Sequence, residues 1–390
     1  MAKKKIAILT GGGDVPGLNL AIKNVVMGAN DEDVDVVGIR RGWGGLLWYN
    51  IDDSATHHQY IMPLDHNIVR TVDRSGGTFL HTSRTNPQAV RPKDIPDFLV
   101  NSSLGKQIRD DGTKDFTPHI TKVLEHLGID SLITIGGDDT LSFSARLSKD
   151  GFPVVAIPKT MDNDVNGTEY CIGFSTAITG AVSLLTNFRT SVGSHERIGV
   201  VELFGRNSGE TSLITGYLSY ADRTIICEVP FNTQKLTEFL VKDKRDNPSN
   251  YAIVVISEGA TTDGGLVVES GEADAYGHKK LGGIGEILAE QIKLFSGHNT
   301  MFQKLAYLVR SGPPDMTDRM VAMNFGSLAW QLTSHGEFGK MVAINNGRYN
   351  AVALSTVSHN LRHVDVDKYY DTQQYRPKVK NILGLPMFLE

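Results

Sequence analysis

The sequence has little cysteine and no long hydrophobic run, although 40% of its 390 residues are hydrophobic. Cys171 and Cys227 are the only cysteines and no CxxC pair occurs, so a disulfide framework is excluded and a reducing, cytoplasmic setting is favoured. No apolar stretch is long enough to cross a membrane. Residues 1–5 are basic but lead into a strand pattern, not into the apolar core of a signal peptide. We therefore expect a cytoplasmic protein with no membrane partner.

An excess of positive charge is also absent, since the formal net charge is −5 at pH 7. Nothing in this charge favours nucleic acid as a partner, so any bound phosphate must be held by local positive groups. The sequence contains no GxxxxGK[ST] motif. Its glycine-rich turn at 11–17 does not match GxGxxG, because Pro16 occupies the last glycine position. Neither a Walker ATPase nor a dinucleotide-binding fold is therefore indicated by motif.

Strand, turn and helix patterns alternate along the chain. Residues 5–10 predict a strand, and the helix expected after the glycine-rich turn has apolar residues at a 3.6-residue period. Residues 34–39 resume as a strand and complete a βαβ unit. The length indicates two or three compact units. We predict an α/β fold with mainly parallel sheets and with functional residues at the carboxyl ends of the strands.

Two segments have less regular patterns. Residues 41–46, which place Trp43 between glycines, predict a loop, and residues 101–117 predict a polar surface insertion.

The glycine-rich turn at 11–17 has two interpretations. Its successive backbone N–H groups before a helix could bind an anion, or the glycines could serve only a tight turn with positive φ.

Charged residues follow two apolar runs in the middle of the chain. Residues 131–135 lead into Gly136-Gly137-Asp138-Asp139-Thr140, and residues 154–157 lead into Pro158-Lys159-Thr160-Met161-Asp162-Asn163-Asp164. Apolar runs bounded by Gly or Pro are typical of buried parallel strands. Four carboxylates and one ammonium would then lie together at two strand ends, where open α/β sheets bind ligands.

These residue types fit phosphoryl transfer, which needs a divalent ion, positive charge on the phosphates and a group that accepts the proton of the nucleophile. Asp138 is a candidate ligand of Mg²⁺, and Asp162 is a candidate general base toward a hydroxyl, with Asp164 on the same turn. The candidate phosphate-binding cations are Lys159, Arg84, Arg197, Arg206 and Arg310. For any single arginine, an ordinary surface ion pair is the alternative.

Several segments together closely resemble the 6-phosphofructokinases, over about residues 4 to 330. In chain order they are residues 12–19, 136–140, 158–164, Gly205-Arg206, 257–259 and 310–319. The resemblance implies two Rossmann-like α/β domains with the site between them. It implies a larger donor-binding domain at 1–173 and about 309–355, a smaller sugar-phosphate domain at 174–308, and a C-terminal tail at 356–390 packed on the surface.

The resemblance also implies a role for each matching residue. Asp162 matches the base that takes the proton from the 1-hydroxyl of the sugar, Asp138 matches the magnesium ligand, and Gly12 would lie against the donor phosphates. Arg84 matches an arginine on the donor side. The residues that match sugar-phosphate contacts are Thr160, Phe204, Gly205, Arg206, Glu258, Arg197, Tyr307 and Arg310, some of which reach a neighbouring subunit in the family. We add Asp164 to the substrate-binding candidates, and Asp139, Lys159 and Arg206 to the catalytic ones.

Asp139 and Lys159 are the residues from which we predict the donor. Members that use ATP commonly carry glycine at the position of Asp139 and often at that of Lys159, whereas the pyrophosphate-dependent branch carries Asp and Lys. A carboxylate at 139 would take up space and add negative charge where the α-phosphate of ATP would lie. An ammonium at 159 would add positive charge near the shorter donor. We therefore predict transfer from diphosphate to fructose 6-phosphate with Mg²⁺, as a reversible glycolytic step in a homodimer or homotetramer.

Two other functions remain open at this stage: an ATP-dependent enzyme of the same family, and a non-catalytic regulatory or sugar-phosphate-binding protein on the same fold. The sequence also departs from the family at several positions. Phe204 stands where Met is usual, Tyr307 where His is common, and Ser311 where Gly is usual. Met301 stands where an arginine is expected, and Lys304 is a candidate to compensate for it.

Overall fold

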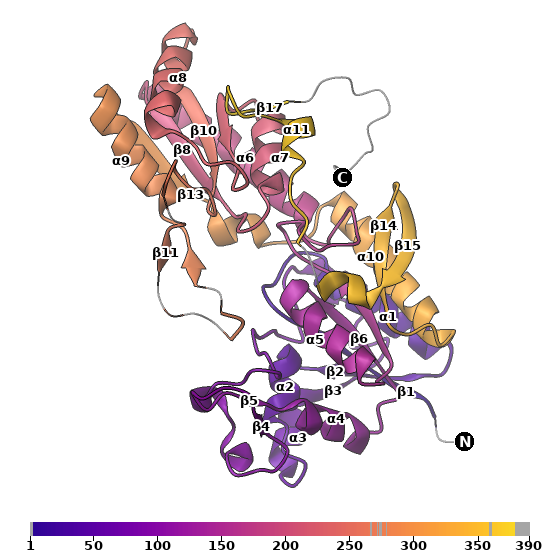
Figure 1. Ribbon diagram of the computed structural model, residues 1–390. Helices are drawn as coiled ribbons and strands as arrows, with labels where there is room; N and C mark the ends of the chain where they lie inside the picture. Colours follow the sequence, from indigo (N-terminus) through magenta and orange to yellow (C-terminus); the bar gives the residue numbers. More distant parts are fainter. Residues whose placement is uncertain are drawn as a thin grey trace.

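The computed structural model describes residues 3–265, 267–270, 272, 275–277, 279–358 and 361–378. Its described part forms two lobes, each built around its own sheet (Figure 1). The first sheet has seven strands in the order β15-β14-β7-β6-β1-β2-β3, and only its edge strands β3 and β15 run antiparallel. The second has four parallel strands in the order β13-β8-β10-β9. The predicted α/β fold with mainly parallel sheets is confirmed.

The strands are short, as expected for buried parallel sheets. Those of the first sheet are β1 (Lys5–Thr10), β2 (Asp35–Ile39), β3 (Ile61–Leu64), β6 (Ser131–Gly136), β7 (Val154–Pro158), β14 (Lys340–Asn345) and β15 (Arg348–Ala353). Those of the second are β8 (Ile198–Leu203), β9 (Arg223–Ile225), β10 (Ala252–Ser257) and β13 (Thr300–Lys304). Three small antiparallel pairs are β4 (Lys106–Gln107) with β5 (Lys114–Asp115), β11 (Glu269–Ser270) with β12 (Lys280–Leu281), and β16 (Tyr370–Asp371) with β17 (Arg376–Pro377).

Helices cover the sheets. They are α1 (Leu18–Asp31), α2 (Gly42–Trp48), α3 (Ser54–Tyr60), α4 (Thr117–His126), α5 (Asp138–Lys149), α6 (Phe174–Ser194), α7 (Glu210–Leu218), α8 (Thr233–Asp246), α9 (Ile284–Ser296), α10 (Met316–Ser334) and α11 (Val366–Tyr369). Five 3₁₀ turns are η1 (Val72–Arg74), η2 (Pro92–Asp94), η3 (Asp97–Leu99), η4 (Ala306–Arg310) and η5 (Leu354–Ser358). Within the described ranges, none of these helices combines the length and the apolar character needed to cross a bilayer.

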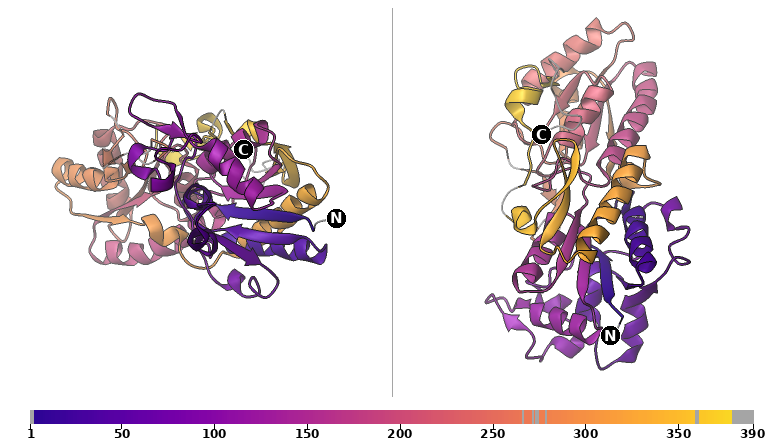
Figure 2. Two further views of the ribbon diagram at one scale, coloured as in Figure 1. Left: turned by 90° about the horizontal axis from the view of Figure 1, so that it is seen from below. Right: turned by 90° about the vertical axis from the view of Figure 1, so that its right-hand side faces the viewer.

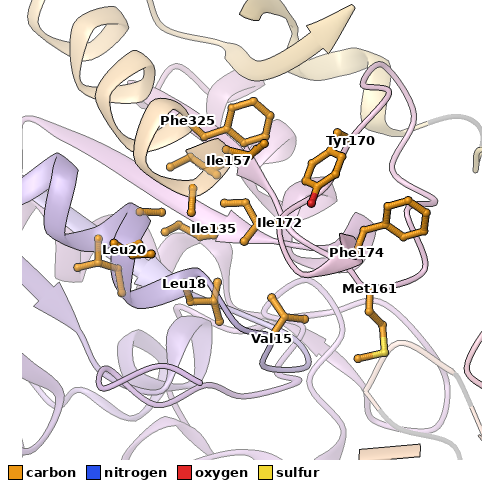
Figure 3. Close-up of a cluster of buried hydrophobic side chains, with 14 of the residues drawn as sticks. Val15, Leu18, Leu20, Ile135, Ile157, Met161, Tyr170, Ile172, Phe174 and Phe325 are labelled. Carbon is orange, nitrogen blue, oxygen red and sulfur yellow. The ribbon is translucent and has the colours of Figure 1, made fainter. Parts of the chain in front are cut away.

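The first sheet is buried on both faces. Alternate residues of β1 point to opposite sides, so Ile6 and Ile8 join one hydrophobic cluster and Ala7 and Leu9 join the other. Helices α1 and α10 pack side by side over the first of these faces (Figure 2). This apolar cluster extends directly beneath the strand ends, where Met161 joins it (Figure 3). The turns that carry the charged residues therefore rest on a packed core.

The prediction of a loop at residues 41–46 is wrong, because this segment begins helix α2. Trp43 is buried, its ring centroid lies 4.7 Å from that of Phe143, and Leu46 and Leu47 join the same cluster. Tertiary burial thus outweighs the low helix propensity of the glycines. A side chain at Gly45 would place its Cβ 1.9 Å from the Arg40 carbonyl oxygen, so glycine is required there.

The tail predicted at 356–390 is more than a surface covering in the part that the structure describes. Tyr369, Tyr370 and Tyr375 are buried in the hydrophobic cluster of the second sheet. The Tyr370 hydroxyl donates to the Thr224 carbonyl at 2.7 Å. Residues 379–390 lie outside the described residues. The division of the chain into a donor-binding domain and a sugar-phosphate domain stays a prediction.

A buried carboxylate fixes the first turn of α6. Asp318, fully buried in α10, accepts hydrogen bonds from Gly173 N, Thr176 N and Thr176 Oγ1, and from the Tyr170 hydroxyl. Each buried donor left unsatisfied costs about 1–3 kcal/mol, so Asp318→Ala is expected to lower the free energy of unfolding by at least about 3 kcal/mol. Chemical denaturation measures this change.

The control for this prediction is Asp150→Ala. Asp150 forms an exposed ion pair with Arg146 at 2.7 Å. Its loss is expected to cost less than about 0.5 kcal/mol. Equal costs for the two variants would contradict the role given to Asp318.

Candidate active site

A cavity of about 180 Å³ lies where the two lobes meet. Its walls come from the segments that follow five parallel strands. The lining residues of these segments include Gly12 after β1, Asp138 and Asp139 after β6, Lys159, Thr160, Met161, Asp162 and Asp164 after β7, Phe204 and Arg206 after β8, and Glu258 after β10. The register pairs Gly136 with Pro158 and Thr10 with Ile135, so the ends of β1, β6 and β7 are level. The fold therefore brings the predicted strand-end residues to one place.

The glycine-rich turn after β1 lines the donor-side wall. Gly12 has a φ of 78°, and its backbone N–H donates to the Ser83 carbonyl at 3.0 Å. A Cβ at Gly12 would lie 3.3 Å from Nζ of Lys159, which donates to the Gly13 carbonyl at 2.6 Å. The turn therefore needs positive φ and also lines the cavity. The backbone N–H groups of Gly11 and Gly12 both donate to carbonyls, so anion binding by this turn stays a prediction.

Asp138 and Asp139 are the first two residues of α5. Carboxylates are favoured in the first turn because the helix dipole is positive there. Both residues line the cavity. The helix therefore presents two adjacent acidic residues at the end of β6, on the strand next to the one that carries Lys159 and Asp162.

The turn after β7 holds two buried carboxylates, Asp162 and Asp164. Among the described residues, Oδ1 of Asp162 is a buried atom without a hydrogen-bond partner. Burial, together with the nearby charge of Glu258, raises the pKa of Asp162. Burial and the charge of Asp162 raise the pKa of Asp164. A carboxylate that lines a cavity, has a raised pKa and has one oxygen without a partner is suited to accept a proton from a ligand.

Four cationic side chains surround these carboxylates, and they are Arg84, Lys159, Arg206 and Arg310. Burial, with repulsion from Arg310, lowers the pKa of Lys159 to about 8. The guanidinium of Arg310 lies 4.3 Å from the ring centroid of Tyr307, and its Nη2 lies 3.5 Å from Oδ1 of Asp14. Arg206 donates from Nη2 to the Lys279 carbonyl at 2.6 Å.

The lining residues include six carboxylates against these four cations, a formal charge of −2 when all are ionised. A polyanionic ligand would not enter such a cavity without added positive charge. No group of three or more His, Cys, Asp or Glu side chains in the described ranges forms a metal cage. Mg²⁺ needs only one or two carboxylates when phosphate and water complete its shell, so Asp138 with a bound phosphate fits this ion.

Three predicted site residues do not form the wall of this cavity. Gly205 lies behind it, where its carbonyl accepts from the Ser257 hydroxyl at 2.8 Å. Tyr307 is 60% exposed and lies behind two residues of the wall, Arg310 and Phe204, whose ring centroid is 6.1 Å from that of Tyr307. Arg197 precedes β8, at the end opposite to the cavity, and the lining residue Phe204 is seven residues, or roughly 23 Å, further along the strand direction. A role for Arg197 therefore requires the site of a neighbouring subunit, and it stays a prediction.

Lys304, the candidate to compensate for the missing arginine at Met301, has a different partner. Its Nζ lies 2.8 Å from Oε1 of the fully buried Glu202. The ammonium is therefore engaged next to the cavity, in neutralising a buried carboxylate.

Three further residues line the cavity without being among the predicted site residues: Asp14, Asn207 and Tyr276. Asp14 belongs to the glycine-rich turn, so its place in that motif was an available signal. Tyr276 comes from the segment between β11 and β12, and its hydroxyl donates to the Thr85 carbonyl at 2.9 Å, next to Arg84. No local pattern marks a contact between residues so far apart in the chain.

Comparisons of the sequence with a family model and with curated proteins all point to the phosphofructokinases. A family model described as Phosphofructokinase matches residues 5–333. The chain is 36% identical over 373 residues to "Pyrophosphate--fructose 6-phosphate 1-phosphotransferase" of Amycolatopsis mediterranei, across 95% of this chain and 99% of that one. It is 33% identical over 375 residues to "ATP-dependent 6-phosphofructokinase" of Corynebacterium efficiens, across 96% and 99%.

A solved structure shares the fold. The phosphofructokinase of Saccharomyces cerevisiae matches with a TM-score of 0.71 and 22% identity over 91% of this chain, which spans 45% of that longer one. The predicted family is confirmed: this chain is a member of the phosphofructokinase family.

Proposed function

We propose that this protein transfers a phosphoryl group from diphosphate to the 1-hydroxyl of fructose 6-phosphate. The products are fructose 1,6-bisphosphate and phosphate, and the reaction is reversible. The observation that carries the proposal is the buried, unpartnered carboxylate oxygen of Asp162 in a cavity lined by four cations. Enzymes catalyse phosphoryl transfer mainly by positioning the reactants and by stabilising the negative charge of the transition state, and the residues of this cavity can do both.

The residues divide into a donor side and a sugar side. On the donor side, Gly12, Arg84 and Lys159 bind the diphosphate. On the sugar side, Asp162 accepts the proton of the 1-hydroxyl, and Arg206 and Arg310 stabilise negative charge. The proposed sugar-phosphate contacts include Thr160, Phe204, Glu258 and, from a neighbouring subunit, Arg197. Asp138 would hold Mg²⁺, which neutralises phosphate charge when bound.

The choice of donor rests on Asp139 and Lys159. Asp139 lies at the cavity wall, where a carboxylate would repel an additional phosphate group. Lys159 is 3% exposed and reaches the glycine turn, so its ammonium lies where the phosphates of a short donor would bind. Overall similarity supports the same donor, since the relative named for pyrophosphate is 36% identical to this chain and the one named for ATP is 33% identical.

ATP-dependent transfer is the second candidate, and only the assay of both donors separates it from the first. A non-catalytic binding protein is disfavoured because Asp162 and Asp138 both line the cavity. We keep the cytoplasm as the expected location, in keeping with two free cysteines. We also keep a homodimer or homotetramer as the expected assembly, because Arg197 can act only at the site of another copy.

The test is direct product analysis. The purified protein is incubated with Mg²⁺, fructose 6-phosphate and diphosphate, and ³¹P NMR follows the appearance of fructose 1,6-bisphosphate and phosphate. The reverse reaction, started from these two products, should yield diphosphate. Absence of both reactions, in a protein shown to be folded, would refute the proposal.

The pH dependence provides a separate prediction. Because burial raises the pKa of Asp162, its carboxylate gains a proton well above pH 4, the ordinary range of an aspartic acid. The base works only when deprotonated, so kcat/KM should fall tenfold per unit as pH drops through this raised pKa. Glu258→Gln removes the repulsive charge and should move this acid limb to lower pH by less than about one unit, since burial is the larger cause. An acid limb that stays near pH 4 would contradict the burial of the base.

A further inference from the structure

A segment beyond the family match passes behind the catalytic turn. The family model ends at residue 333, whereas residues 361–364 run from the first lobe toward α11 beside α7 (Figure 1). Leu361 pairs with Val165 in an isolated antiparallel bridge, and the backbone N–H of Arg362 donates to the Asp164 carbonyl at 2.9 Å. The tail is therefore bonded to the backbone of the turn that carries Asp162.

The Arg362 side chain reaches further into the same region. Its Nη1 donates to the Glu169 carbonyl at 2.8 Å, and its Nη2 lies 3.5 Å from Oε2 of Glu210. The side chains of Arg362 and Glu210 are 12% and 3% exposed, so this is not an ordinary surface ion pair. Glu210 is the first residue of α7, in the second lobe.

Glu210 and Arg362 converge on Asn163, the residue between the two carboxylates of the turn. Asn163 has a φ of 54°, a left-handed conformation that surrounding contacts must maintain. Its Nδ2 donates to Oε1 of Glu210 at 3.2 Å and to the Glu169 carbonyl at 2.9 Å, the carbonyl that Arg362 also contacts. Its Oδ1 accepts from the backbone N–H of Cys171 at 2.8 Å.

We propose that Arg362 is a positioning residue for the catalytic turn: it holds Glu210 and Glu169 so that Asn163 keeps its conformation and Asp162 keeps its place. The guanidinium suits this task because two nitrogens of its rigid planar fork contact a carbonyl and a carboxylate, whereas an ammonium presents one nitrogen on a flexible stem. Arg362 is not among the residues that line the cavity, so it acts through the turn and not on the substrate directly. This inference rests on the proposed function, since it assigns Arg362 to the placement of the proposed base.

The kinetic test compares two arginines of the same tail. Arg362→Met is expected to lower kcat about 30- to 100-fold, the cost of misplacing a reacting group by about 1 Å, with a small change in the KM of either substrate. Arg376 is the matched control, because it bonds only to the second lobe, at the Asp222 carbonyl and at Asp243. Arg376→Met should leave kcat unchanged.

Glu210→Gln should reproduce the effect of Arg362→Met, and the double variant should lose no more activity than the worse single one, because both act through Asn163. Arg362→Lys keeps the charge but replaces the rigid two-nitrogen fork with a single nitrogen, so its loss of kcat should be smaller, about 3- to 10-fold. If Arg362→Met fails to fold, Arg362→Lys takes its place in the kinetic comparison with Arg376→Met.

A second readout does not depend on activity. The backbone amide of Cys171 donates to Asn163, so its hydrogen exchange reports the state of the turn. Exchange at this amide should be faster in the Arg362 variants than in wild type and unchanged in Arg376→Met. A wild type that turns over no diphosphate would refute the proposed function, while the exchange result would still test the placement of the turn. Equal kcat and equal exchange in the Arg362 and Arg376 variants would overturn the inference.

Discussion

Asp162→Asn is expected to lower kcat about 10²- to 10⁴-fold, the contribution of a positioned general base. The amide has nearly the shape of the carboxylate but does not take the proton of the sugar hydroxyl. The substitution also removes a buried negative charge, which repels Glu258 and costs burial energy. The variant should therefore fold at least as stably as wild type. Steady-state kinetics with diphosphate and fructose 6-phosphate, together with calorimetric binding of the sugar phosphate, measures both effects.

The control for this variant is Asp150→Asn, at the C-terminal end of α5, where the lost carboxylate pairs only with the exposed Arg146. It should leave kcat unchanged. Retention of full turnover by Asp162→Asn, with sugar binding intact, would show that another group accepts the proton.

The donor should change when Asp139 and Lys159 are both replaced by glycine. Loss of the buried ammonium removes a charge preorganised at the donor phosphates, so kcat/KM for diphosphate should fall at least about 10²-fold. Loss of the carboxylate removes the group that excludes the α-phosphate of ATP, so kcat/KM for ATP should rise about tenfold or more. Parallel assays of the two donors give both numbers.

Each single variant should show part of this change. Asp139→Gly should raise kcat/KM for ATP and keep part of the activity with diphosphate. Lys159→Gly should mainly lower kcat/KM for diphosphate. Lys149→Gly with Asp150→Gly is the matched control, because it removes the same two charges at the far end of α5. An unchanged donor ratio in the Asp139 and Lys159 double variant would refute the steric and electrostatic account.

The sequence predicts the central part of the site because that part is local. Apolar runs before Gly136 and Pro158 predict two buried strands, and neighbouring parallel strands bring their carboxyl ends together. The structure places Asp138, Asp139, Lys159 and Asp162 around one cavity for this reason. The same geometry places Arg197 away from the cavity, because a residue that directly precedes a parallel strand lies at the opposite edge of the sheet.

The remaining parts depend on contacts that no local pattern reveals. Helix α2 forms despite three glycines because Trp43 and its neighbours are buried by helix α4 and α5. Tyr276 meets Thr85 across 191 residues of sequence, and Arg362 meets Glu169 across 193. Such contacts follow from the packing of the two lobes and of the tail, which sequence periodicity does not encode.

The most direct test of the central claim is the ratio of kcat/KM for diphosphate to kcat/KM for ATP, measured on the wild-type protein with saturating fructose 6-phosphate and Mg²⁺. The cavity, with Asp139 at its wall and Lys159 against the glycine turn, predicts a ratio of at least about 10², the effect of one preorganised electrostatic contact. A ratio below one, with rapid turnover of ATP, would contradict the assignment of diphosphate as the donor.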